Sequence, residues 1–109
     1  MSPRSAKKIS AADPAVLVLA SLAGGEKHGY AIAADVLDMA GVKLGAATLY
    51  EGLARLAAQG LVQELPRDGR RFPYRLTEQG AQALQRHLAT LDAVVAEGSA
   101  RLRAAGRAS

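Results

Sequence analysis

Three arginines surround a single Asp-Gly dipeptide, and their guanidinium groups are the side chains in this sequence best suited to binding an anion. Arg67 precedes Asp68-Gly69, and Arg70 and Arg71 follow it directly. Asp-Gly favours the tight turn of a β-hairpin, and no hydrophobic core requires arginines at a hairpin tip. Guanidinium groups in this setting suit DNA phosphates or an adjacent minor groove. The alternative is a turn that is basic only for solubility.

A helix predicted at residues 46–59 comes before this hairpin and offers a second polar surface. Its buried stripe consists of leucines that recur at helical spacing, namely Leu49, Leu53 and Leu56. Small residues on the opposite face would let the helix enter a major groove, where Glu51 could accept from a cytosine amine and Arg55 could reach a phosphate or guanine. An ordinary solvated helix is the alternative. The candidate contacts are Ala47, Thr48, Glu51 and Arg55, with Tyr50 on the flank.

Start and stop signals place two further helices before that one. Asp13 and Pro14 suit the N-cap and first position of a helix that stops at Gly24. A second helix is predicted at about residues 28–39, closing at Gly41. Apolar residues at helical spacing predict the buried stripes, which are Val16, Leu19, Ala20 and Ala23 in the first helix and Ile32, Val36 and Leu37 in the second.

The second helix opens with His28-Gly29-Tyr30. We interpret His28 as a capping or surface residue and Gly29 as a point where another backbone approaches closely. A structural role is favoured for Tyr30 alone, and contact with a phosphate is the alternative. Asp35 and Asp38 lie one helical turn apart without a base or metal partner, so a solvated face is predicted there.

Two strands and a long helix complete the predicted order. Alternating residues predict strands at 61–65 and 72–76, and Pro73 should make their pairing imperfect because proline has no N–H. Thr77 suits the N-cap of a last helix that could run to about Ala104. Spacings of three and four along this helix resemble a coiled-coil seam. Ala81 and Gly98 fall on this seam, and the residues predicted to form a dimer are Leu84, Leu88, Leu91, Val95 and Leu102.

Composition narrows the class of protein. The chain has 109 residues, a net charge of +4 and no cysteine, which suits a polyanionic partner and excludes disulfides and thiolate chemistry. The two histidines, His28 and His87, fall in different elements with no acidic cluster beside them. We therefore predict no metal, no cofactor and, without a nucleophile–base pair, no enzyme.

Residues 15–23 form an apolar run behind a basic start, as in a secretory signal. Asp13 and Pro14 interrupt this pattern and suit a helix start instead. No segment reaches the roughly 18 apolar residues of a membrane span. The sequence therefore predicts a cytoplasmic protein with no membrane contact.

Several short motifs follow one another in a fixed order. They are Lys-His-Gly-Tyr at 27–30, Leu-Gly at 44–45, Thr-Leu-Tyr at 48–50, Leu53, Arg-Leu at 55–56, Gly-Leu-Val at 60–62, Asp-Gly-Arg-Arg at 68–71, Tyr-Arg-Leu-Thr-Glu at 74–78 and Gly80. In this combination the chain resembles the PadR family of winged-helix transcriptional regulators over about residues 13–91. The resemblance implies a homodimer joined through the C-terminal helix with help from the first helix, a pseudo-palindromic operator and, usually, repression.

The resemblance also implies roles for single residues. Tyr30, Thr48 and Tyr50 would position the DNA backbone or anchor the helix, and Arg70 and Arg71 would be wing contacts. Some relatives stack planar ligands between aromatic residues at the dimer centre, but the terminal helix here contains no aromatic residue. An unidentified small-molecule effector is therefore left open without a predicted site.

Together these features predict a mainly α fold with a small β-hairpin, formed by a winged helix-turn-helix and a long C-terminal dimerisation helix. We divide the chain into a flexible basic arm at 1–12, a DNA-binding domain at 13–76, and a dimerisation helix with a short tail at 77–109. The predicted function is a sequence-specific, double-stranded-DNA-binding transcriptional regulator that represses as a homodimer. The alternative is a winged-helix protein-interaction module that docks an acidic partner protein.

Overall fold

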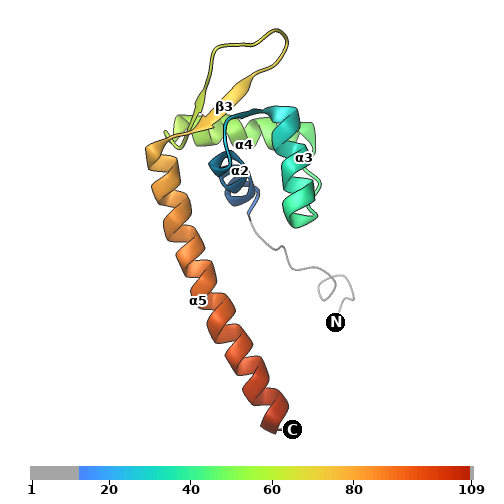
Figure 1. The fold of residues 1–109 in the computed structure, drawn as a ribbon, viewed down its shortest axis with the longest axis vertical. Coiled ribbons are helices and arrows are strands. Elements are labelled where there is room, and N and C mark those ends of the chain that lie inside the picture. The colour runs from blue at the N-terminus through green and yellow to red at the C-terminus, as the bar shows by residue number, and fades with distance from the viewer. Residues whose placement is uncertain (1–12, 109) are drawn as a thin grey trace.

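The computed structural model describes residues 13–108, so the predicted arm at 1–12 lies outside the described residues. Helices dominate, and a small antiparallel sheet joins them (Figure 1). The predicted fold class is confirmed. The elements are α2 (Pro14–Ala23), β1 (Lys27–His28), α3 (Gly29–Ala40), α4 (Ala46–Ala58), β2 (Val62–Glu64), β3 (Pro73–Leu76) and α5 (Glu78–Ala108).

Local capping explains where α2 and α3 begin and end. The Asp13 carboxylate accepts a hydrogen bond from the backbone N–H of Ala15 at 2.8 Å, and Pro14 occupies the first position of α2. His28 Nδ1 accepts from the N–H of Ala31 at 3.3 Å, which confirms its capping role. Gly41 ends α3 in the left-handed region at φ 68°, where glycine avoids the strain of a side chain.

The sheet has three strands in the order β1-β3-β2, whereas the sequence predicts only the β2–β3 hairpin. In β1, Lys27 lies opposite Tyr74 and His28 lies opposite Pro73. A strand of two residues is too short to show a period, so the pattern could not reveal it. The other strands are shorter than predicted, and Phe72 lies outside β3.

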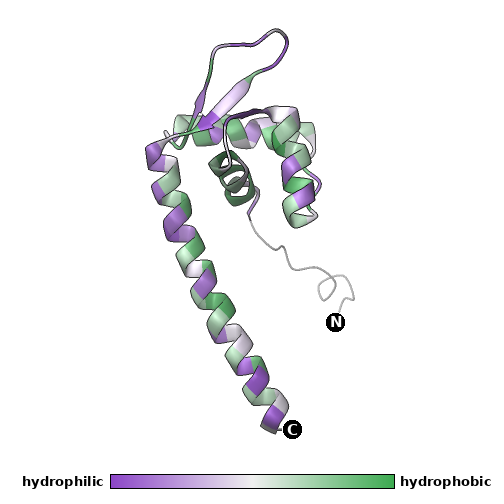
Figure 2. Ribbon diagram, in the orientation of Figure 1, coloured by the Kyte–Doolittle hydropathy of each residue, from purple (hydrophilic) through white to green (hydrophobic). Residues whose placement is uncertain are grey.

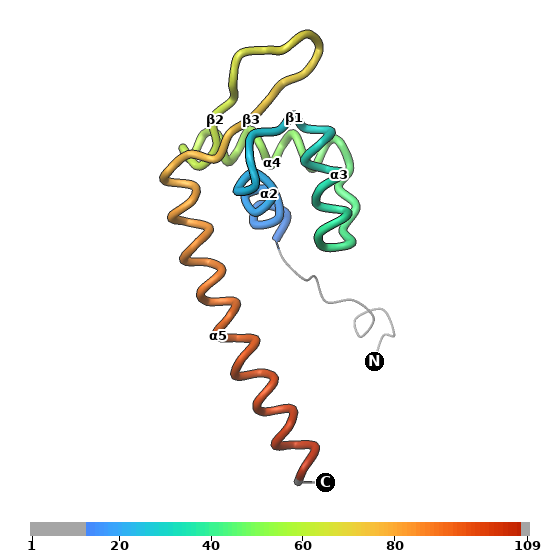
Figure 3. Tube along the Cα trace, viewed as in Figure 1, coloured from blue at the N-terminus to red at the C-terminus, as the bar shows by residue number. Residues whose placement is uncertain are grey.

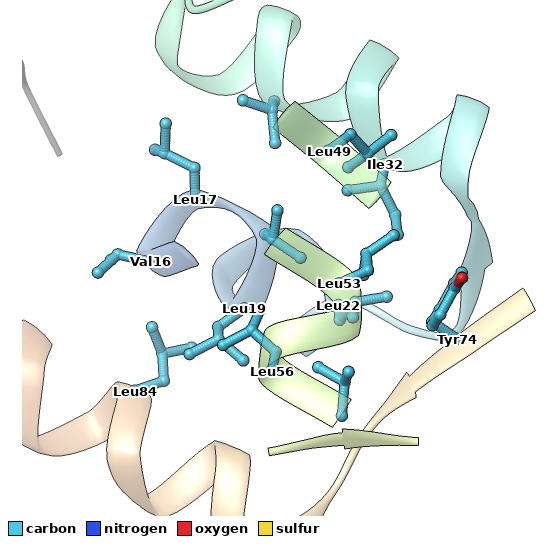
Figure 4. Packing of buried hydrophobic residues seen from close by; sticks show 13 residues of the cluster. Val16, Leu17, Leu19, Leu22, Ile32, Leu49, Leu53, Leu56, Tyr74 and Leu84 are labelled. Atoms are coloured by element: carbon cyan, nitrogen blue, oxygen red, sulfur yellow. The ribbon is translucent and has the colours of Figure 1, made fainter. Parts of the chain in front are cut away.

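The core is built around α2, which is strongly hydrophobic along its length (Figure 2) and contributes several of the buried side chains (Figure 4). The single stripe predicted for this helix is too narrow, because Leu17, Val18 and Leu22 are buried together with Val16 and Leu19. It also extends too far, because Ala23 at the end of α2 is exposed. A helix that is apolar all round belongs in the interior of a domain. The other buried hydrophobic residues are Ile32, Val36, Leu49, Leu53, Leu56, Val62, Tyr74 and Leu84.

Three expectations for α3 are wrong. Tyr30, for which a core or structural role is favoured over phosphate contact, is 80% exposed and does not cover the core. Leu37, predicted to be buried, is 49% exposed, because the core contacts of α3 come from Ile32 and Val36. Asp35, predicted on a solvated face, accepts a hydrogen bond at 2.7 Å from the hydroxyl of the buried Ser21. Lys27 Nζ lies 4.0 Å from the same carboxylate, so a polar contact joins α2, β1 and α3.

The start of α5 is in direct contact with Gly60 and Leu61, which follow α4 in the chain. The Thr77 hydroxyl donates to the Gly60 carbonyl at 2.7 Å and accepts from the Gly80 N–H at 3.0 Å, which confirms Thr77 as the cap. A Cβ at Gly80 would lie 2.9 Å from the carbonyl carbon of Leu61 and 2.8 Å from Leu76 Cδ1. Only glycine therefore fits at position 80, where the first turn of α5 packs against the residue that precedes β2.

Beyond this start, α5 leaves the rest of the fold, as the long helix in Figures 1 and 3 shows. It has 31 residues and continues past the predicted end at Ala104. Its early residue Leu84 is only 6% exposed and belongs to the core around α2. The predicted boundary after residue 76 thus marks the start of a helix whose first turns share that core.

Candidate nucleic-acid interface

Helix α4 presents its polar residues as the leucine spacing predicts. Leu49, Leu53 and Leu56 are buried, which confirms the inward stripe. The remaining candidate residues on this helix, Ala47, Thr48, Tyr50, Glu51 and Arg55, are all exposed. Gly45 occupies the N-cap without a side-chain hydrogen bond, and Gly60 follows the helix at φ 77°. The helix can therefore offer one continuous outer face to a partner.

One flank of α4 meets the wing, which we define as residues 62–76, and the start of α3. These elements enclose a groove of about 210 Å³, which we call the wing groove. Its lining residues are His28, Gly29, Tyr30, Tyr50, Arg70, Arg71 and Phe72. Four candidate residues from three separate elements, Tyr30, Tyr50, Arg70 and Arg71, thus share one concave surface.

The other flank of α4 faces the beginning of α2. Thr48, Glu51 and Arg55 line a second groove of about 480 Å³ together with Asp13 and Pro14, and we call it the α2–α4 groove. The candidate contacts are therefore divided between two grooves on opposite flanks of one helix. Ala47 and Arg67 line neither groove.

The turn at the tip of the wing differs by one residue from the predicted Asp68-Gly69. Asp68 and Arg71 exchange backbone hydrogen bonds of 3.0 Å, so Gly69 and Arg70 are the central pair. Gly69 has φ 63°, as the first central residue of a type II′ turn does. This geometry places Arg70 within the turn itself.

The three wing arginines are not equivalent. The Arg67 guanidinium carbon lies 5.0 Å from the centroid of the Phe72 ring, within the range of a cation–π interaction. Arg67 thus packs across the wing, whereas Arg70 and Arg71 line the wing groove. Farther from the tip, Arg75 hydrogen-bonds to Gln63 of the neighbouring strand.

Sequence reasoning did not include His28, Gly29 and Phe72 among the candidate site residues, although all three line the wing groove. The motif at residues 28–30 contains two of them, His28 and Gly29. Nothing in that motif indicates that the wing lies beside it. Pairing of β1 with β3 brings them together, since His28 is opposite Pro73. Phe72 was assigned to a strand, where its contact with Arg67 was not expected.

Tyr74 lies under this surface with its ring in the core (Figure 4). Burial raises the pKa of its phenol above the ordinary value of 10.0, and the negative charge of Glu64 and the nearby Tyr50 phenol add to the effect. Each of these causes favours the protonated phenol. The tyrosine is therefore neutral at physiological pH and acts as an apolar support with a polar end.

Two features are missing from the described residues, namely a cluster of metal ligands and a membrane-spanning helix. Among residues 13–108, no group of three or more His, Cys, Asp or Glu residues is placed to hold a metal ion. In the same range, no helix has both the length and the apolar character required to cross a membrane.

The helical pair α3–α4 followed by the wing is the arrangement of a winged helix-turn-helix. The F93 protein from STIV, a winged-helix DNA-binding protein, superposes with a TM-score of 0.68, at 16% identity, over 73% of this chain and 88% of that chain. This likeness shows the winged-helix fold.

The sequence model of the transcriptional regulator PadR-like family matches residues 18–86. The chain therefore belongs to this family. A PadR family transcriptional regulator from Eggerthella lenta DSM 2243 is 30% identical, with a TM-score of 0.63 and 80% of each chain covered. Membership confirms the resemblance that the sequence motifs indicate. It also assigns the chain to a family of transcriptional regulators rather than enzymes.

A longer relative also matches. An uncharacterised 37.1 kDa protein in transposon Tn4556 of Streptomyces fradiae is 46% identical over 74 residues, which are 68% of this chain and 21% of that protein. This chain therefore spans about one fifth of the length of that relative.

The raised pKa of Tyr74 predicts a stability effect at alkaline pH. Because the folded pKa exceeds the unfolded value, the stabilisation is complete below the unfolded pKa near 10 and is lost as pH rises through the folded pKa. Urea unfolding of the wild type and Tyr74→Phe between pH about 8 and 11.5 should show a steeper alkaline loss in the wild type. Parallel curves would contradict this account, and Tyr30→Phe, which removes an exposed phenol, is the control.

Proposed function

We propose that this chain binds double-stranded DNA in a sequence-specific manner as a homodimer and represses transcription where its operator overlaps a promoter. The observation that carries the proposal is the wing groove, in which Arg70 and Arg71 from the wing lie with Tyr30 from α3 and Tyr50 from α4. Two guanidinium groups and two phenols on one surface suit the oxygens of a DNA backbone.

In this proposal α4 enters the major groove. Ala47 and Glu51 lie on the face of α4 opposite the buried leucines. The small side chain of Ala47 lets the helix approach the bases closely, and the Glu51 carboxylate accepts a hydrogen bond from a cytosine amine. Thr48 and Arg55 on the adjoining flank contribute to base or phosphate contact. Arg70 and Arg71 contact the phosphates or the neighbouring minor groove, and Arg67 supports the wing through Phe72.

The α2–α4 groove supports a contact on the opposite flank. Asp13, the first described residue, lies in this groove beside Thr48 and Arg55. Arg4, Lys7 and Lys8 precede it in the sequence and lie outside the described residues. We expect these three positive charges to add salt-dependent affinity for phosphates.

The outer part of α5 supports the homodimer. Leu88, Val95 and Leu102 are exposed, and the exposed fraction of Leu102 reaches 76%. Leu91 is partly buried and falls on the same stripe, whereas Leu84 is already covered by the core around α2. An apolar stripe at coiled-coil spacing is stabilised by pairing with a second copy. The proposed interface therefore begins at Leu88 and continues outward.

A dimer of this kind would place two α4 helices in successive major grooves, about 34–36 Å apart. The second candidate function is docking of an acidic partner protein onto the basic wing. One observation favours it, because Glu51 stands on the outer face of α4, where it would repel phosphates. A small-molecule effector is not needed for either proposal.

Selection from a randomised duplex pool at moderate salt tests the proposed function directly. We expect an enriched inverted repeat whose half-sites are centred about one helical turn apart, because two-fold symmetry of the protein is mirrored in the operator. A stable dimer that enriches no sequence would reject sequence-specific binding and favour the acidic partner.

Removal of the two wing-groove arginines should weaken binding to every duplex. In Arg70→Ala/Arg71→Ala, the slope of log affinity against log salt should fall by about two units, at ~0.9 per phosphate contact. Fluorescence anisotropy across a salt series measures this slope. Arg86→Ala/Arg103→Ala removes the same charge from exposed positions on α5 and should leave the slope unchanged. An unaltered slope in the wing variant would remove the wing from the DNA contact.

A charge within the α5 stripe should separate the two copies. Leu88→Asp places a carboxylate in the proposed apolar interface, where its desolvation is unfavourable. Sedimentation equilibrium should then report a monomer, whereas Gln85→Asp, exposed on the same helix outside the stripe, should remain dimeric. A Leu88→Asp protein that still sediments as a dimer would refute this interface.

A further inference from the structure

Gly29, the first residue of α3, is in contact with a side chain from α4. A Cβ built on Gly29 would lie 2.7 Å from Cζ and 2.9 Å from Cε1 of Tyr50, well inside any real carbon–carbon contact. The Tyr50 hydroxyl is nearer still, so the hydroxyl end of this phenol packs directly against Gly29. The sequence predicted close approach of a backbone at this position, and the approaching group is a side chain.

The backbone itself does not require glycine here. Gly29 is not among the glycines with positive φ, which are Gly25, Gly41, Gly60 and Gly69. Alanine is also the better helix former by about 1 kcal/mol within a helix, so neither conformation nor propensity selects glycine at the start of α3. An alanine at position 29 would instead clash with the Tyr50 ring.

The position of Tyr50 matters because its ring lines the wing groove with Arg70 and Arg71. Tyr50 is 43% exposed, so one side of the ring is packed and the other is open to the groove. Within residues 13–108, its hydroxyl forms no hydrogen bond. Packing against Gly29, and not a hydrogen bond, therefore holds the hydroxyl in place while leaving it able to donate to a ligand.

We propose that Gly29 is a positioning residue for DNA binding: its missing side chain sets the Tyr50 hydroxyl beside Arg70 and Arg71, so that all three groups can meet one backbone phosphate. This inference rests on the proposed function. A methyl group at position 29 would push the ring away from α3 and misalign the hydroxyl with the two guanidinium groups. Because hydrogen bonds weaken steeply with poor geometry, a small displacement is enough to lose the contact.

A double-mutant cycle tests the proposal on the full chain. The variants are Gly29→Ala, Tyr50→Ala and the two combined, and the probe is a mixed-sequence duplex at low salt. Gly29→Ala and Tyr50→Ala should each weaken binding by about tenfold, the size of one hydrogen bond to a charged group. The combined variant should bind no more weakly than Tyr50→Ala alone, because the methyl group then has no ring to displace.

Thermal unfolding of each variant separates positioning from stability. Gly29→Ala should unfold within a few degrees of the wild type, since the far end of the Tyr50 side chain can move aside. Gln82→Ala is the control, because Gln82 is exposed near the start of α5 and lies outside the seam. It should leave DNA affinity unchanged.

Three results would overturn the inference. They are an unchanged affinity in Gly29→Ala, additive losses in the combined variant, and a fold that is lost in Gly29→Ala but restored in the combined variant. The last result would assign the contact to stability. If Tyr50→Ala binds DNA normally while the Arg70→Ala/Arg71→Ala variant does not, the inference fails and the proposed DNA binding stands.

Discussion

The burial of α2 on most of its sides is the constraint on which the rest of the structure depends. With one phenylalanine and no tryptophan, the chain has few large side chains to fill a core. A central aliphatic helix solves this problem, since every other helix can pack a leucine, isoleucine or valine against it. Helix α4 and the start of α5 both pack against α2, so the position of α4 is determined by the core helix that it contacts.

Local chemistry explains why so much of the fold could be predicted from sequence. The ends of α2 and α3 depend on Asp13, His28 and Gly41, each of which acts on neighbours within a few residues. The inward face of α4 follows equally from leucine spacing. The burial of α2 on most of its sides, the exposure of Leu37 and the contact between Asp35 and Ser21 depend on segments that are distant in the sequence. No local periodicity contains that information.

For the candidate interface, the residue types could be predicted from the sequence but their arrangement in space could not. The arginines, the tyrosines and the outer face of α4 could be selected from sequence because their chemistry suits phosphates and bases. Their assembly could not be predicted, since the two-residue strand β1 joins the start of α3 to the wing. The division of the contacts between two grooves, the shift of the turn to Gly69-Arg70 and the seat of Tyr50 on Gly29 all follow from tertiary packing.

The hydroxyl of Thr77 has a mechanical consequence. It bridges the carbonyl of Gly60, just after α4, and the N–H of Gly80, in the first turn of α5, while Gly80 itself packs on the backbone of Leu61. These contacts tie the start of α5 to residues 60–61, which follow α4 in the chain. The direction in which the exposed outer part of α5 leaves the core therefore follows from these contacts around its first turn.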